Sequence, residues 1–178
     1  MSNELLISAL PWEEYDLDEN FSQLKIMIYG ESGLGKSVLA GSICAVDGGC
    51  PTLGLDVEGG MTSLAAFGYK GQDKIRFLKV KNFSEGEKAY TVAKDFLIAN
   101  KGAFKSVLID SLTSLQAKMI KEICVKQGKE NPDLKVWNRA SALMTEELEG
   151  IKDLGLHVVI TALAKEVRDE ASGKLSIM

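Results

Sequence analysis

The feature that most constrains the fold of this chain is an apolar run that leads directly into a glycine-rich octet. The run, Ile26 to Tyr29, predicts a buried strand, and residues 30–37, GESGLGKS, follow it without a break. The octet has the form G-x-x-x-x-G-K-[ST], a phosphate-binding loop. Residues 38–43 can begin a helix, so the chain has the strand, loop and helix order that this motif requires. A chance glycine-rich turn is the alternative, and this flanking context argues against it.

Each residue type in the octet suits a bound polyphosphate. Glycines at 30, 33 and 35 permit positive φ angles and close backbone approach to an anion, and a following helix directs its positive end there. Lys36 supplies a charge for the β- and γ-phosphates, and the Ser37 hydroxyl is a candidate Mg²⁺ ligand. We therefore expect nucleotide contacts from nine consecutive residues: Gly30, Glu31, Ser32, Gly33, Leu34, Gly35, Lys36, Ser37 and Val38.

Length and composition describe an ordinary globular chain. With 178 residues, 46% of them hydrophobic and 26% charged, it is one domain long enough to bury a core. No apolar run has the length of a membrane span, and residues 1–20 are acidic, unlike a signal or transit peptide, so we expect a cytoplasmic protein. The net charge of −4 argues against constitutive binding to duplex DNA unless a local basic patch or assembly provides the contact.

Cysteine and histidine usage indicates no metal chemistry. The three cysteines, Cys44, Cys50 and Cys124, form no C-x-x-C pair, and we expect them to be reduced, buried thiols rather than zinc ligands. His157 is the only histidine and lies in an apolar run, so we expect a core position for it.

The rest of the chain alternates between predicted strands and helices. We expect residues 1–20 to form an acidic leader or arm and residues 21–178 to form the domain. Further strands are predicted at 52–57, 75–80, 105–111 and 157–162. Helices are predicted at 61–67, at 88–100 after a capping box at 84–87, from 111 or 113 to 126, and at 136–154, with a possible hairpin from 163 to 178 that turns at 169–173. This pattern predicts an α/β fold with a mostly parallel five-stranded sheet covered by helices on both faces.

Two carboxylates at predicted strand ends are candidates for the remaining chemistry. Asp110 ends an apolar strand in the Walker B form and should face Ser37 and its Mg²⁺, since ligands of open parallel sheets lie at the carboxyl ends of strands. A helix N-cap is the alternative role for Asp110. Glu58 is the candidate for polarising water, with Asp56 two residues earlier on the same strand as a partner that points the same way. A pair of solvent-facing carboxylates is the alternative there.

Three further polar residues are weaker candidates. Thr161 ends the fifth strand and can sense a γ-phosphate through its hydroxyl. Lys165 or Arg168, in the next loop, can reach a phosphate in the same subunit or in a neighbour. Solvated loop cations are the commoner case.

The order of these parts resembles that of the RecA-like P-loop ATPases. GESGLGKS, LDVEGG, VLIDS, Trp137 at the start of a long helix and HVVITA follow one another, and the resemblance covers residues 25–174. It looks closest to compact phage and prophage ATP-binding proteins with an AAA-type domain, some linked to single-strand annealing recombination. It implies ATP and Mg²⁺ as cofactors, Glu58 as the catalytic glutamate, Asp110 as the Mg²⁺-associated aspartate, and strand 157–162 between the phosphate-loop strand and the Walker B strand. RecA-type members usually carry a polar residue, often Gln, near the end of the fifth strand, where this chain has Ala162 and Leu163.

Three functions remain open from the sequence. The first is an Mg²⁺-dependent ATPase of phage or prophage DNA recombination or replication, a homo-oligomer acting on single-stranded DNA. Its DNA contacts would come from the 165–174 loop or from a lysine surface: Lys118, Lys121, Lys126 and Lys129. The second is a nucleotide-gated module that hydrolyses slowly or not at all and holds a protein partner. The third, a small-molecule kinase, is disfavoured by the small number of arginines.

Overall fold

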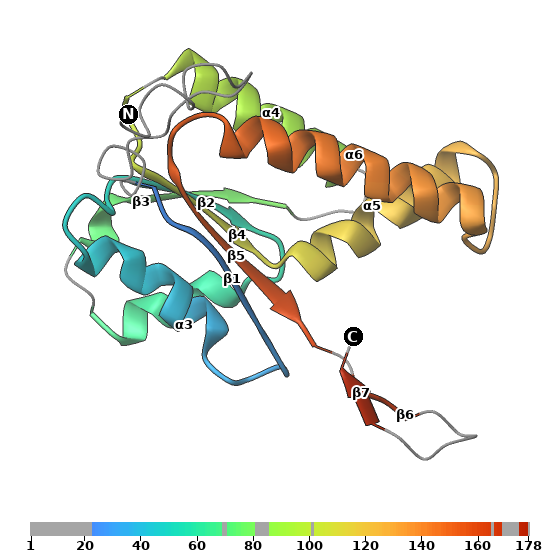
Figure 1. Ribbon diagram of the computed structural model, residues 1–178, viewed down its shortest axis with the longest axis horizontal. Coiled ribbons are helices and arrows are strands. Elements are labelled where there is room, and N and C mark those ends of the chain that lie inside the picture. The colour runs from blue at the N-terminus through green and yellow to red at the C-terminus, as the bar shows by residue number, and fades with distance from the viewer. Residues whose placement is uncertain are drawn as a thin grey trace, which may run out of the picture.

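The computed structural model describes residues 23–68, 71–80, 86–100, 102–164, 166–168 and 175–177. The acidic leader predicted for residues 1–20 lies outside these ranges, so the division into leader and domain stays a prediction. Within them the chain forms one layered α/β arrangement (Figure 1).

Five parallel strands form the central sheet. They are β1 (Lys25–Gly30), β2 (Thr52–Asp56), β3 (Ile75–Lys79), β4 (Ser106–Asp110) and β5 (His157–Leu163). Their order across the sheet is β1-β5-β4-β2-β3, and every pairing is parallel. The predicted fold class is confirmed, as is the position of β5 between the phosphate-loop strand and the Walker B strand. All five strands therefore end at the same edge of the sheet.

Helices cover the sheet on both faces (Figure 1). One face carries α3 (Lys36–Gly41), which continues as a 3₁₀ turn, η1 (Ser42–Ala45), and lies against the 3₁₀ segment η2 (Gly60–Ala66). The other face carries α4 (Gly86–Ala99), α5 (Leu112–Lys126) and α6 (Leu134–Lys152). A short 3₁₀ turn, η3 (Gln72–Lys74), precedes β3.

Side-chain alternation along the strands produces two cores. Val107 and Ile109 of β4 pack with buried residues of α4, α5 and α6, whereas Leu108 between them packs with α3, η1 and η2. β5 repeats this division, with Val159 on the α3 side. Because successive side chains of a strand point to opposite faces, the next residue in phase with Leu108 is Asp110. Strand geometry alone thus turns Asp110 toward the face that carries the phosphate loop.

Several predicted element boundaries are wrong. The helix predicted at 136–154 begins at Leu134, because the Asp133 side chain accepts a hydrogen bond from the Val136 N–H (2.9 Å) and caps it. The segment predicted as a helix at 61–67 is the 3₁₀ segment η2.

The C-terminal hairpin is confirmed as an antiparallel pair of short strands, β6 (Glu166–Arg168) and β7 (Leu175–Ile177). It extends from the end of β5 away from the sheet (Figure 1). The turn predicted at 169–173 lies outside the described residues.

Two ion pairs involve helices of the face that carries α4, α5 and α6. Lys94 of α4 contacts Glu147 of α6 (N–O 2.7 Å), and the hydrogen bond to that carboxylate raises the pKa of Lys94. Lys129 contacts Asp133 (2.7 Å), and this hydrogen bond, with that from the Val136 N–H, lowers the pKa of Asp133. The Asp133 carboxylate therefore stabilises the start of α6 above its unfolded pKa, and this stabilisation is lost as the pH falls through its lowered folded pKa.

The cysteine prediction is wrong for two of the three residues. The structure joins Cys44 and Cys50 in a disulfide, since the turn between α3 and β2 brings their Cα atoms to 4.9 Å, while Cys124 is free and buried as expected. His157, predicted in the core, is only partly buried, because it begins β5 and its Nδ1 accepts a hydrogen bond from the Leu24 N–H (2.9 Å).

Replacement of a core leucine tests the packing of α5. Leu115 is fully buried in the α4–α6 core, and Leu134 is 74% exposed. We expect Leu115→Ala to lower the free energy of unfolding by about 2–5 kcal/mol, because it leaves a cavity, and Leu134→Ala to change it by less than about 0.5 kcal/mol. Urea unfolding measures both, and equal effects of the two variants would contradict the assigned packing.

Candidate nucleotide-binding site

The glycine-rich loop joins β1 to α3 at the carboxyl edge of the sheet. Gly33 and Gly35 have φ angles of 82° and 78°, a region that residues with a Cβ adopt only with strain. Gly30 has no positive φ, contrary to expectation, because it is the last residue of β1 and still pairs with Leu163. A Cβ there would meet only side-chain atoms, 3.4 Å from Leu34. Two of the three glycines are thus required by backbone conformation.

Lys36 is the cation of the loop. Its Nζ donates a hydrogen bond to the Glu31 backbone carbonyl (2.6 Å) across the turn. This bond places the ammonium group over the loop that precedes it. A phosphate oxygen that enters the loop can replace this carbonyl as the acceptor.

Asp110 lies against Ser37, as its position at the sheet edge predicts. The Ser37 hydroxyl donates to Asp110 Oδ2 (2.6 Å), and the Thr161 hydroxyl donates to the other oxygen, Oδ1. Thr161 is fully buried, and Asp110 is 2% exposed. The alternative role of Asp110 as a helix N-cap is wrong, because the N-cap of α5 is Ser111. The Thr161 hydroxyl is therefore buried against the Asp110 carboxylate and is not exposed at the surface of the site.

Glu58 lies beyond the end of β2 and contacts the first turn of α5. Its Oε1 accepts hydrogen bonds from the hydroxyls of Ser111 and Ser114. Asp56 ends β2 and accepts a hydrogen bond from the Gly59 N–H (2.7 Å). The predicted pairing of Asp56 and Glu58 on one strand is therefore wrong, because the strand stops between them and each carboxylate has its own donors.

Lys36, Ser37, Glu58 and Asp110 line one hollow of about 460 Å³. It is lined by loop residues, by η2 and by the strand ends: Ser32, Gly33, Gly35, Lys36, Ser37, Val38, Glu58, Gly60, Thr62, Ser63, Phe67, Asp110 and Leu163. A Cβ at Gly60 would lie 3.1 Å from Ser37 Oγ and 3.2 Å from Asp110 Oδ2. The absence of a side chain at Gly60 therefore keeps space beside a hydroxyl and a carboxylate oxygen, the hard oxygen donors that Mg²⁺ prefers.

Among the described residues that line this hollow, Lys36 is the only cation. Lys165 and the side chain of Arg168 lie outside the described residues. Three members of the predicted lysine surface have partners: Lys118 donates to the Val80 carbonyl (3.2 Å), Lys126 contacts Glu122 (2.9 Å), and Lys129 contacts Asp133. Each of these three lysines thus already contacts a group of the protein, whereas the predicted DNA surface requires it to contact a phosphate.

Sequence reasoning missed Ser111, Ser114 and Gly60 as parts of the site. Ser111 was considered only as a helix start, and the partner of Ser114 lies 56 positions away in the sequence. The two consecutive glycines after Glu58 could have indicated the role of Gly60, since glycine often marks a position where another group approaches the backbone closely.

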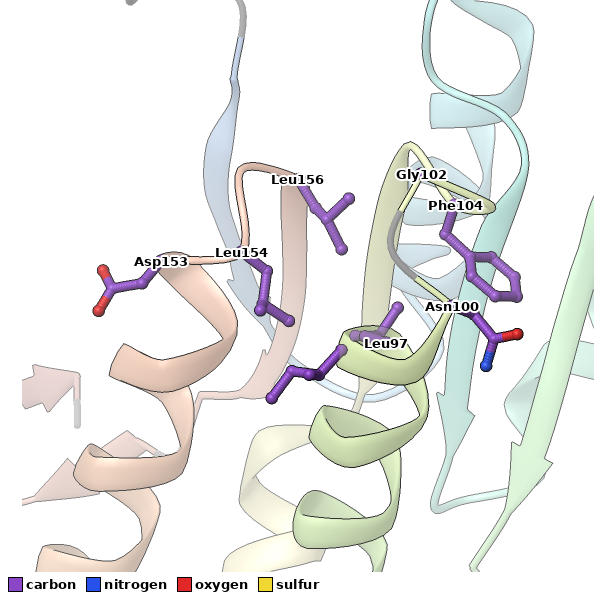
Figure 2. A pocket seen from close by; sticks show the side chains of 8 residues that line it. Leu97, Asn100, Gly102, Phe104, Asp153, Leu154 and Leu156 are labelled. Carbon is purple, nitrogen blue, oxygen red and sulfur yellow. The ribbon is translucent and has the colours of Figure 1, made fainter.

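A second hollow, of about 200 Å³, lies at the opposite end of the sheet (Figure 2). It is formed where α4 and α6 end, by Leu97, Ile98, Asn100, Gly102, Phe104, Asp153, Leu154 and Leu156. Among the described residues that line it, one is a carboxylate, Asp153, and none is a lysine or an arginine.

The parallel sheet, the glycine-rich loop between β1 and α3, and the facing Asp110 together define a P-loop NTPase core. A family model described as an AAA domain matches residues 22–176. The chain therefore belongs to this AAA-type family of P-loop ATPases. A search of curated proteins finds no match. Among the described residues, no helix is both long and apolar enough to cross a bilayer.

Gly60→Ala tests the space beside Ser37 and Asp110. The added Cβ would crowd both oxygens, so we expect the gain in ATP affinity that Mg²⁺ provides to fall about tenfold or more. Affinity without Mg²⁺ should change by less than about threefold, because the loop glycines and Lys36 are untouched. Titration calorimetry with and without Mg²⁺ measures both, and an unchanged Mg²⁺ dependence would contradict this interpretation of Gly60.

Proposed function

We propose that this protein is an Mg²⁺-dependent ATP hydrolase. The observation that carries the proposal is the hydrogen bond from Ser37 to Asp110, which joins the phosphate loop to the Walker B strand end. Glu58 lines the same hollow on the side of α5. A loop that binds phosphates, an oxygen pair suited to Mg²⁺ and a carboxylate near both are the parts that phosphoryl transfer to water requires.

Each residue has a distinct task in the proposed reaction. Lys36 exchanges its bond to the Glu31 carbonyl for the β- and γ-phosphate oxygens and offsets their charge. Ser37 and Asp110 would hold Mg²⁺, and Thr161 keeps the Asp110 carboxylate oriented. The metal, when bound, neutralises charge on the phosphate oxygens.

Glu58 is the proposed water-orienting residue. Its carboxylate accepts a hydrogen bond from a water molecule and receives its proton as the water oxygen bonds to the γ-phosphorus. The bond from that phosphorus to the β–γ bridging oxygen breaks, which yields ADP and inorganic phosphate. Among the described residues, Glu58 is contacted through neutral hydroxyls.

A nucleotide-gated binding module is the second candidate function. The end of β5 favours it: Thr161 is buried against Asp110, and the apolar Leu163 lines the hollow where RecA-like ATPases usually carry a polar residue. Such a module would bind ATP tightly, turn it over slowly and present a surface to a protein partner.

We further propose a cellular role in phage or prophage DNA recombination or replication, with single-stranded DNA as substrate and a homo-oligomer as the active form. The resemblance to RecA-like proteins and the projecting β6–β7 hairpin support this role. The net charge of −4 and the engaged lysines of α5 oppose it.

Two variants test hydrolysis directly. We expect Lys36→Ala to weaken ATP binding by about tenfold or more, and Glu58→Gln to keep binding but lower kcat by about 10²–10⁴-fold, because the amide cannot accept the proton. Phosphate release and ATP titration measure these effects, with the exposed Lys135→Ala and Glu130→Gln as matched controls. Tight ATP binding with negligible wild-type turnover would instead support the nucleotide-gated module.

Added single-stranded DNA separates the cellular roles. For a recombination ATPase we expect oligonucleotides to raise kcat several-fold, in a manner that weakens with salt because phosphate contacts release counterions. Turnover at 50 mM and 200 mM salt, with and without a poly-dT oligonucleotide, measures the effect. Equal turnover in all four conditions would contradict a DNA-stimulated function.

A further inference from the structure

Two serine side chains at the start of α5 contact the Glu58 carboxylate. Ser111 caps the helix and accepts a hydrogen bond from the Ser114 N–H (3.3 Å), while both hydroxyls donate to Glu58 Oε1. Oε2 has no hydrogen bond from any described residue. One oxygen of the carboxylate is thus anchored twice, and the other is left for an incoming ligand.

Backbone hydrogen bonds fix both sides of this contact. The Val57 N–H, one residue before Glu58, donates to the Asp110 carbonyl, one residue before Ser111 (2.7 Å). The Thr113 hydroxyl, on the same turn, accepts a hydrogen bond from the Leu163 N–H at the end of β5 (3.0 Å). The turn that holds Glu58 is therefore tied to β2, β4 and β5.

The Glu58 side chain itself requires such an anchor. It is exposed, and a glutamate in solvent samples many rotamers. Efficient attack by water requires a fixed geometry, since a displacement of about 1 Å can cost up to about 10²-fold in rate. Two hydroxyl donors from a capped helix provide this fixed geometry without adding a charge that would compete for the water.

We propose that Ser111 and Ser114 are positioning residues that hold Glu58 for catalysis through Oε1 and leave Oε2 to the attacking water. The proposal rests on the function proposed above, with Glu58 as the water-orienting group. It assigns the start of α5 a role in hydrolysis, in addition to its role in the fold.

Ser114 is the better residue for a test, because Ser111 also caps α5 and its loss would weaken the helix. We expect Ser114→Ala to lower kcat about tenfold while the KM for ATP stays within about twofold, and Ser114→Thr, which keeps a hydroxyl, to restore most of the rate. Ser141→Ala, at an exposed position of α6, is the matched control.

A double-mutant cycle with Glu58→Gln separates positioning from a general structural effect. If Ser114 acts through Glu58, Ser114→Ala causes no further loss in the Glu58→Gln background. Equal losses in both backgrounds, or a wild-type kcat in Ser114→Ala, would overturn the proposal while leaving Glu58 as the catalytic residue. Full turnover in Glu58→Gln, or none in the wild type, would overturn the proposed function and this inference with it.

Crystal structures of the nucleotide-free wild type and Ser114→Ala supply a readout that does not depend on turnover. We expect one ordered Glu58 rotamer in the wild type and more than one in the variant. A single, unchanged rotamer in both proteins would overturn the positioning role.

Discussion

The site depends on the hydrogen bond between Ser37 and Asp110, because it joins two segments that are 73 positions apart in the sequence. That bond follows from the parallel sheet. β1 and β4 run in the same direction with β5 between them, so the loop after β1 and the last residue of β4 meet at one edge. Alternation along β4 then places Asp110 on the α3 face. An antiparallel β4 would carry the same aspartate to the far end of the sheet.

Three carboxylates lie near this edge, and the structure separates them by the donors that each receives. Asp110 is held by two hydroxyls, Asp56 by the Gly59 N–H, and Glu58 by two serines of α5. All of these donors are neutral. Among the described residues, these carboxylates are thus held in place by neutral donors, an arrangement that favours a cation such as Mg²⁺, and Lys36 is the cation contributed by the loop.

Sequence reasoning predicted the parts of the site whose signals are local. The phosphate loop, the strand ahead of it and Asp110 are each readable within a few residues, and strands with continuous apolar runs predicted the parallel sheet correctly. Contacts between distant segments were missed. The role of Ser114 depends on Glu58, which lies on another element, and the disulfide depends on the path of the turn between Cys44 and Cys50. The predicted start of α6 at residue 136 is two residues late, because the Asp133 side chain caps a helix that begins at Leu134.

The contacts of α5 suggest how packing and chemistry depend on each other in this fold. Leu115 and Met119 anchor the helix in the core, about one turn and two turns after Ser111. A shift of α5 therefore moves Ser114 and the Glu58 carboxylate together, whereas Lys36 and Ser37 belong to α3 on the opposite face. The residues proposed for phosphate binding and for water activation thus lie in different layers of the molecule, and Asp110, at the end of β4, lies between the two layers. A perturbation of the α4–α6 layer should affect turnover more than affinity, because the phosphate-binding groups are anchored in the other layer.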